Sequence, residues 1–89
     1  MMLEITNFYE GLVITQINDA CEERNINLSD DAIHDIACLS LNQLPPRYIR
    51  HAIDAIFYIP EDERLQMTSE VKKAVNHAIS KVIDNPRQP

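Results

Sequence analysis

Two consecutive prolines, Pro45 and Pro46, constrain the fold of this chain more than any other feature of its sequence. Proline fixes its own backbone angle φ, lacks an amide donor, and drives the residue before it out of the helical region. A helix that approaches from the N-terminal side must therefore end before Pro45. The segment after the prolines leaves the turn in a defined direction, and it begins with Arg47 and Tyr48.

Two helical patterns precede the prolines. Apolar residues at helical spacing predict a first helix over residues 7–24, and Asn7 with Glu10 three residues later resembles a capping box. Ser29 is a good N-cap for a second helix, and two aspartates in the first turn favour that helix through its dipole. The second helix ends before Pro45.

Gly11, the only glycine of the chain, lies inside the first predicted helix. Glycine in a helix costs about 1 kcal/mol relative to alanine. Two interpretations stay open at this point. Either the cost is simply tolerated, or another backbone approaches Gly11 closely.

The pattern changes between Tyr48 and Ile59. Apolar residues alternate there with a period of two, which predicts an extended segment or short strand. A helix is the alternative, because Ile49, Ile53 and Ile56 also fit a helical spacing. A lone strand leaves its backbone groups unpaired, so the same strand of a second subunit is the natural partner.

The predicted fold is mainly α, with three main helices and one extended segment or short strand that pairs across a dimer. The sequence PEDER at 60–64 turns the chain, and a third apolar helical pattern runs from Met67 to about Asp84. We expect residues 1–84 to form a single domain and residues 85–89 to form a disordered tail. A chain of 89 residues buries a limited core, which makes a homodimer a natural supplement.

The charge balance limits the partners of this protein. Eight Lys and Arg stand against fourteen Asp and Glu, for a net charge of −6, which argues against broad binding of DNA or anionic membranes. The first ten residues lack the basic region of a signal peptide, and no apolar run approaches the ~20 residues needed to cross a bilayer. The expected location is cytoplasmic.

Metal binding and catalysis find little support in the residues. His34 and Cys38 are four apart on the second helix, and Cys21 is the one other cysteine. Zinc usually takes closely spaced ligand pairs, which are absent, so we expect buried cysteines that act as small hydrophobes and no metal or cofactor. No phosphate-binding loop, metalloprotease helix or nucleophile elbow occurs, and we predict no catalytic residue and no enzymatic activity.

The best candidate binding site follows the prolines and consists of Arg47, Tyr48, Arg50 and His51. Arginine forks suit phosphate or a guanine edge, while the aromatic rings can stack or form hydrogen bonds. Taken singly, each residue also has a structural interpretation. Arg47 would then hold carbonyls at the end of the second helix, and Tyr48 would pack in the core.

The block DIACLSLNQLPPRYIRHAID at 35–54 resembles the late competence development protein ComFB family, whose signature is ALNxLPPRY. Leu41, Asn42, Leu44 and the run PPRY at 45–48 match this signature, and FYEGLVITQI at 8–17 matches the family's opening in character. The resemblance implies a small, cytoplasmic, mainly helical and dimeric protein. Other members carry a cysteine cluster before the signature helix and can hold zinc there, but NINLSDDAIHDIA at 25–37 lacks that cluster.

The resemblance also implies a function, because some members are receptors for cyclic dinucleotides, chiefly cyclic di-GMP. These receptors act on partner proteins in competence, motility or biofilm control. Cyclic di-GMP has two phosphates and two guanines related by two-fold symmetry, and a two-fold dimer would offer each half the same arginines and aromatics. We therefore expect a dimeric receptor with an unidentified protein partner. The alternatives are an interaction module without a small-molecule ligand and, more remotely, a redox or metal module that uses His34 and Cys38.

Overall fold

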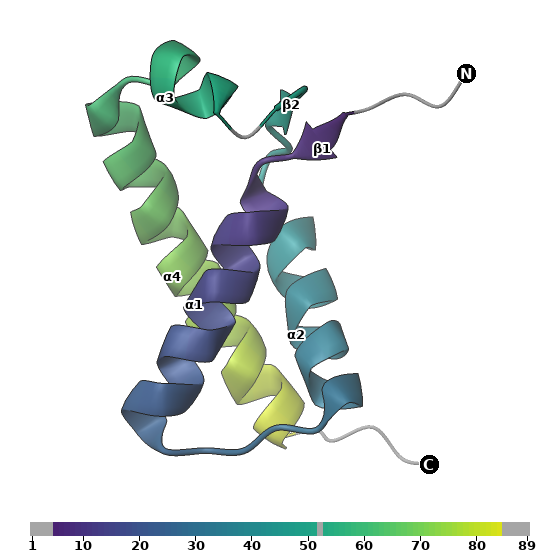
Figure 1. Ribbon diagram of the computed structural model, residues 1–89. Coiled ribbons are helices and arrows are strands. Elements are labelled where there is room, and N and C mark those ends of the chain that lie inside the picture. The colour runs from purple at the N-terminus through teal and green to yellow at the C-terminus, as the bar shows by residue number, and fades with distance from the viewer. Residues whose placement is uncertain (1–4, 52, 85–89) are drawn as a thin grey trace.

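The computed structural model describes residues 5–51 and 53–84 of the chain (Figure 1). Its elements follow one another as β1 (Thr6–Asn7), α1 (Tyr9–Arg24), α2 (Asp30–Asn42), β2 (Tyr48–Ile49), α3 (Asp54–Tyr58) and α4 (Glu61–Asp84). The fold is mainly α with three main helices, as predicted. The tail expected at residues 85–89 lies outside the described residues.

The three long helices, α1, α2 and α4, pack against one another and build the core. In Figure 1, α1 and α4 cross, and α2 lies beside the crossing. Each helix turns one apolar stripe inward, and the fully buried large side chains include Val13, Ile17, Ile36, Val75 and Ile79. Burying an aliphatic side chain of this size stabilises the folded state by roughly 1.5–3 kcal/mol. The apolar stripes of the sequence therefore mark the surfaces along which the helices pack.

Helix α2 begins and ends where the local signals predict. The side-chain oxygen of Ser29 accepts a hydrogen bond from the backbone N–H of Ala32 at 3.1 Å, so Ser29 is the N-cap. The helix ends at Asn42, three residues before Pro45. Ser40 is fully buried in the helix interface, and its hydroxyl donates to the carbonyl of Ile36 at 2.7 Å, which satisfies the buried oxygen.

Helix α1 starts at Tyr9, slightly later than residue 7, and ends in a left-handed residue, Asn25, with φ 53°. The N–H of Asn25 donates to the carbonyl of Glu22, and the N–H of Ile26 donates to that of Cys21. This pair of bonds is a Schellman motif, which satisfies carbonyls at the end of a helix. It turns the chain sharply from α1 towards α2.

The region 48–59 is not one strand. Residues Tyr48–Ile49 form β2, and the prediction of extended structure is correct there, but Asp54–Tyr58 form the helix α3. The partner of β2 lies within the same chain: β1 pairs with it in antiparallel register, Thr6 opposite Ile49 and Asn7 opposite Tyr48. β2 is therefore not the lone strand from which pairing across a dimer was inferred, because β1 occupies one of its two edges.

Helix α4 begins at Glu61, so the sequence PEDER forms its first turn rather than a separate turn. Three acidic residues occupy this first turn, where the helix dipole favours negative charge. Proline is compatible with a helix start because the first amide groups need no helical partner. The acidic run therefore favours the helix that it was predicted to precede.

Gly11 lies on an exposed part of α1, and a Cβ atom added there would meet nothing within 4 Å. Among residues 5–51 and 53–84, no backbone approaches this residue closely. Within this described part of the chain, the glycine is therefore a tolerated cost of the fold.

Candidate functional site

The short sheet and its hydrogen bonds hold the end of the PPRY segment, at Arg47 and Tyr48, next to the start of α1. Phe8 donates its backbone N–H to the carbonyl of Arg47 at 2.7 Å, and Arg47 donates its own N–H to the side-chain oxygen of Asn7 at 3.0 Å. Asn7 in turn donates its N–H to the carboxylate of Glu10 at 3.2 Å. The capping-box residues predicted from the sequence thus hold the first turn of α1 and the residue after the prolines in one network.

The side chain of Arg47 reaches α4 rather than the end of α2. Its Nη1 lies 3.4 Å from Oε1 of Glu63, and both side chains are about two-fifths exposed, at 42% and 41%. The interpretation that Arg47 holds carbonyls of α2 is therefore wrong. An ion pair this exposed contributes little stability, so an anionic ligand can compete with Glu63 for the guanidinium.

The remaining candidates are exposed. The side chain of Tyr48 is 67% exposed, so the interpretation that it packs in the core is wrong. Arg50 and His51 are exposed as well. All four candidate side chains therefore present accessible surface to a ligand.

An open pocket of about 340 Å³ lies between β2 and α3, and it is lined by Arg47, Tyr48, Ile49, Arg50, Asp54, Tyr58 and Ile59. Its volume is within the range of small-molecule sites. Three of the four residues singled out from the sequence line this pocket. His51 does not, but its carbonyl accepts the N–H of Asp54 at 2.9 Å and so connects β2 to α3.

Besides the apolar Ile49 and Ile59, sequence reasoning missed two lining residues that carry polar groups, Asp54 and Tyr58. They are the first and last residues of α3, four apart, and residues with this spacing lie on the same side of a helix. Their spacing was visible in the sequence, but the alternating interpretation placed them in an extended segment. The pocket thus combines two guanidinium groups, two phenol rings and one carboxylate.

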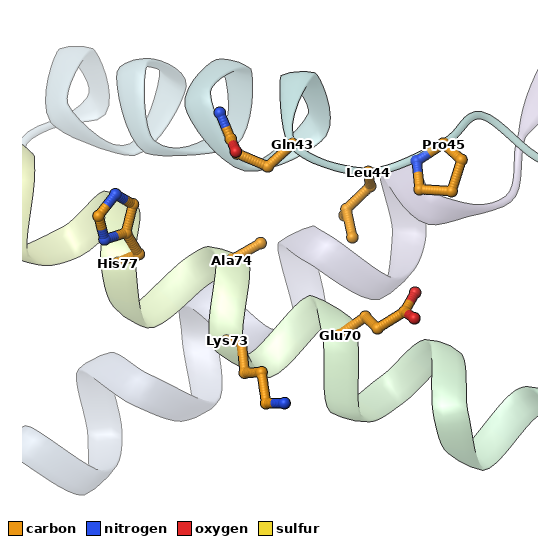
Figure 2. Close-up of a pocket in the computed structure, with 7 residues that line it drawn as sticks. All are labelled: Gln43, Leu44, Pro45, Glu70, Lys73, Ala74 and His77. Atoms are coloured by element: carbon orange, nitrogen blue, oxygen red, sulfur yellow. The ribbon is translucent and has the colours of Figure 1, made fainter.

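Two other pockets have different chemistry. The pocket in Figure 2 has about 420 Å³ and is lined by Gln43, Leu44, Pro45, Glu70, Lys73, Ala74 and His77. There Leu44 points from the end of α2 towards α4, whereas Lys73 points away from α2 (Figure 2). Although it is larger, it has neither a pair of arginines nor an aromatic wall of tyrosines.

A groove of about 370 Å³ between α1 and α4 is lined by Phe8, Leu12, Glu61, Arg64, Leu65 and Thr68. The Nε of Arg64 is buried and has no hydrogen-bond partner among the described residues. This groove offers apolar contact beside one guanidinium, one carboxylate and one hydroxyl group. Of these three pockets among the described residues, the one between β2 and α3 has the groups that suit an anionic, aromatic ligand.

The metal-binding candidates do not come together. His34 and Cys38 are exposed on α2, and Nδ1 of His34 lies 2.6 Å from the carbonyl oxygen of Asp30. Cys21 is half-buried against the core, whereas the exposure of Cys38 contradicts the prediction of two buried cysteines. Within residues 5–51 and 53–84, no group of three or more His, Cys, Asp or Glu is placed to hold a metal ion.

Tyr9 is the first residue of α1 and belongs to the core, with 4% of its surface exposed. Burial raises the pKa of its phenol above the usual value, and the carboxylates of Glu70 and Glu63 raise it further, while Arg47 opposes them. Arg47 thus interacts electrostatically with both the core tyrosine and the acidic face of α4.

The fold and the pocket define a small, mainly helical protein in which a double-proline turn presents arginine and tyrosine side chains at one pocket. The model of one protein family, described as Late competence development protein ComFB, matches residues 6–86. The chain belongs to the ComFB family. Comparison with curated proteins gives no match. Within the described ranges, no helix is long and apolar enough to cross a membrane.

Proposed function

We propose that this protein is a dimeric cytoplasmic receptor for a cyclic dinucleotide, with cyclic di-GMP as its ligand and no enzymatic activity of its own. The observation that carries the proposal is the pocket in which Arg47 and Arg50 lie together with Tyr48 and Tyr58. Its output would be contact with a partner protein that controls competence, motility or biofilm formation. Membership of the ComFB family supports this class of function.

The pocket's chemistry matches that of the ligand. A guanidinium can form two parallel hydrogen bonds to a phosphate or to O6 and N7 of guanine. Tyr48 is largely exposed, which leaves its ring free to stack on a base, and stacking of this kind is worth roughly 1–3 kcal/mol. His51, exposed beside the pocket, adds a further hydrogen-bonding group at its margin.

Ligand symmetry favours a dimer as the receptor. Each half of cyclic di-GMP carries one phosphate and one guanine, and a two-fold axis between subunits would offer each half the same side chains. Two copies of the pocket would bring four arginines, Arg47 and Arg50 from each subunit, to one ligand. A local positive region would then form on a chain with a net charge of −6.

Calorimetric titration with cyclic di-GMP tests the proposal, with Arg50→Ala as the decisive variant. Arg50 is exposed and makes no ion pair among the described residues, so its loss leaves the fold intact. A charge-assisted hydrogen bond contributes roughly 1.5–3 kcal/mol, which corresponds to a loss of about 10- to 100-fold in affinity. Lys81→Ala, which removes an exposed positive charge near the end of α4, should bind as wild type does. Affinity should also fall as salt rises.

The competing function is an interaction module that binds no small molecule. Exposed apolar side chains on α3 favour it, since Phe57 and Tyr58 are 77% and 75% exposed and are free to contact a partner protein. Wild-type protein that binds no cyclic dinucleotide at concentrations on the order of tens of micromolar would overturn the receptor proposal and favour this second function. If wild type binds but Arg50→Ala binds equally well, the pocket assignment is wrong.

A further inference from the structure

A carboxylate lies in the same pocket as the two arginines. Asp54, the first residue of α3, is half-buried and lines the pocket with Arg47 and Arg50. Its backbone N–H donates to the carbonyl of His51. Its side chain forms no hydrogen bond or ion pair with any described residue, so the carboxylate oxygens are available to a ligand.

A site that only bound phosphate would gain nothing from this carboxylate. A negative charge beside two arginines weakens the attraction of the pocket for an anion. An aspartate at the start of a helix also interacts favourably with the helix dipole. That interaction contributes only about 0.3–1 kcal/mol, and it would be the same if the side chain lay outside the pocket. A ligand that carries hydrogen-bond donors as well as phosphate would use the acidic group.

We propose that Asp54 is the residue that selects guanine over adenine in the bound cyclic dinucleotide. This inference rests on the proposed function. The N1–H and N2–H groups of guanine are adjacent donors, and an ionised carboxylate has two acceptor oxygens and no donor. Adenine presents an unprotonated N1 at the same edge, so its lone pair would face the carboxylate and leave a polar group without a partner.

The helical form of α3 makes this recognition geometrically consistent. Asp54 and Tyr58 are four positions apart and line the same pocket from one side of α3, while Tyr48 lines it from β2. A base held against a tyrosine ring would turn its hydrogen-bonding edge towards side chains at the pocket wall. In an extended segment, residues 54 and 58 would also share a face but would lie ~13 Å apart along the strand, too far apart to contact one base.

The test compares cyclic di-GMP with cyclic di-AMP on wild type and Asp54→Asn by calorimetry. Wild type should prefer cyclic di-GMP by at least ~5-fold, the lower limit for one good bidentate contact. In Asp54→Asn, affinity for cyclic di-GMP should fall about 10- to 100-fold, because one acceptor becomes a donor that faces a donor. Affinity for cyclic di-AMP should stay constant or rise, since the repelling charge is gone and an amide can pair with adenine.

Asp62→Asn is the matched control, because Asp62 is an exposed acid in the first turn of α4 and does not line the pocket. It should leave both affinities and their ratio unchanged. Equal changes for both ligands in Asp54→Asn would show a purely electrostatic or structural effect and overturn the inference. A wild type that binds both ligands equally would overturn it too, with the proposed function intact. A wild type that binds neither ligand would overturn the proposed function, and the inference with it.

Discussion

The side-chain oxygen of Asn7 accepts a hydrogen bond from the backbone N–H of Arg47 at 3.0 Å, although the two residues are forty positions apart. The same oxygen accepts the N–H of Tyr9 at 3.2 Å, at the start of α1. One amide side chain therefore links the first turn of α1 to the signature turn after Pro46. Its loss would affect both a helix end and the wall of the pocket.

Asn7→Ala should destabilise the protein by about 1–2 kcal/mol, because two backbone donors lose their acceptor. Urea denaturation followed by circular dichroism measures this directly. Asn7→Asp is the control, since its carboxylate keeps an acceptor oxygen at the same place and should retain most of the stability. An alanine variant as stable as wild type would mean that water replaces both bonds without cost.

Gly11→Ala should stabilise the protein by about 1 kcal/mol, because alanine is the better helix former and its methyl group would meet nothing within 4 Å. The midpoint of urea denaturation should rise without a change in slope. A loss of stability, or of dimer, would instead indicate that the backbone of a second subunit approaches Gly11.

Alkaline pH should destabilise the protein through Tyr9. Its pKa is raised in the folded state, so above about pH 10 the unfolded chain gives up this proton more readily than the folded chain. Tyr9 therefore leaves the free energy of unfolding unchanged at neutral pH. As pH rises from the unfolded pKa to the higher folded pKa of Tyr9, part of this free energy is lost. Urea denaturation at pH 8 and pH 10.5 should show a fall in wild type and a smaller fall in Tyr9→Phe. Equal falls in the two proteins would rule out Tyr9 as the cause.

The protein should be a homodimer whose interface includes the 48–59 region, and light scattering at micromolar concentration measures this. Because β2 pairs with β1 in the same chain, the reason to expect a dimer is now the exposed apolar surface of this region. The side chains of Ile53 and Phe57 are 61% and 77% exposed. Phe57→Glu should therefore shift the protein towards monomer, because the buried charge would have no partner. Ile83→Glu, at the opposite end of α4, is the control and should leave the dimer intact. A monomeric wild type would contradict the prediction.

The long helices were predictable because their signals are local. Ser29 caps α2 through its own side chain, and Pro45 limits the helix through its own ring, so neither depends on distant contacts. The 48–59 region was not predictable in the same way. Helix α3 has five residues, too few for a period of 3.6 to be distinguished from a period of two. The extent of β2 is set by β1, which lies forty-odd positions earlier and whose second residue, Asn7, was assigned to the first helix.

The site was predictable in the part that is continuous in sequence. Arg47, Tyr48 and Arg50 follow the prolines directly, and a rigid turn keeps neighbours together. Asp54 and Tyr58 join them only because α3 is helical, which the alternating pattern concealed. Glu63, the ion-pair partner of Arg47, was expected in a turn and was not connected to the signature. Such a pairing arises from the packing of α4 and has no local signal.

The sheet of two-residue strands also has a consequence for local unfolding. Closing a flexible loop of about forty residues costs roughly 3 kcal/mol, more than a pairing this short regains by itself. The strands can stay paired only because the packed helices already hold their ends close together. We expect the amide protons of Phe8 and Arg47 to exchange with solvent well before those of Val13 or Val75, which lie in the helical core. A chain whose helices are still folded would then lose the shape of its pocket first, and a ligand that holds the pocket together would slow exchange at those two amides above all.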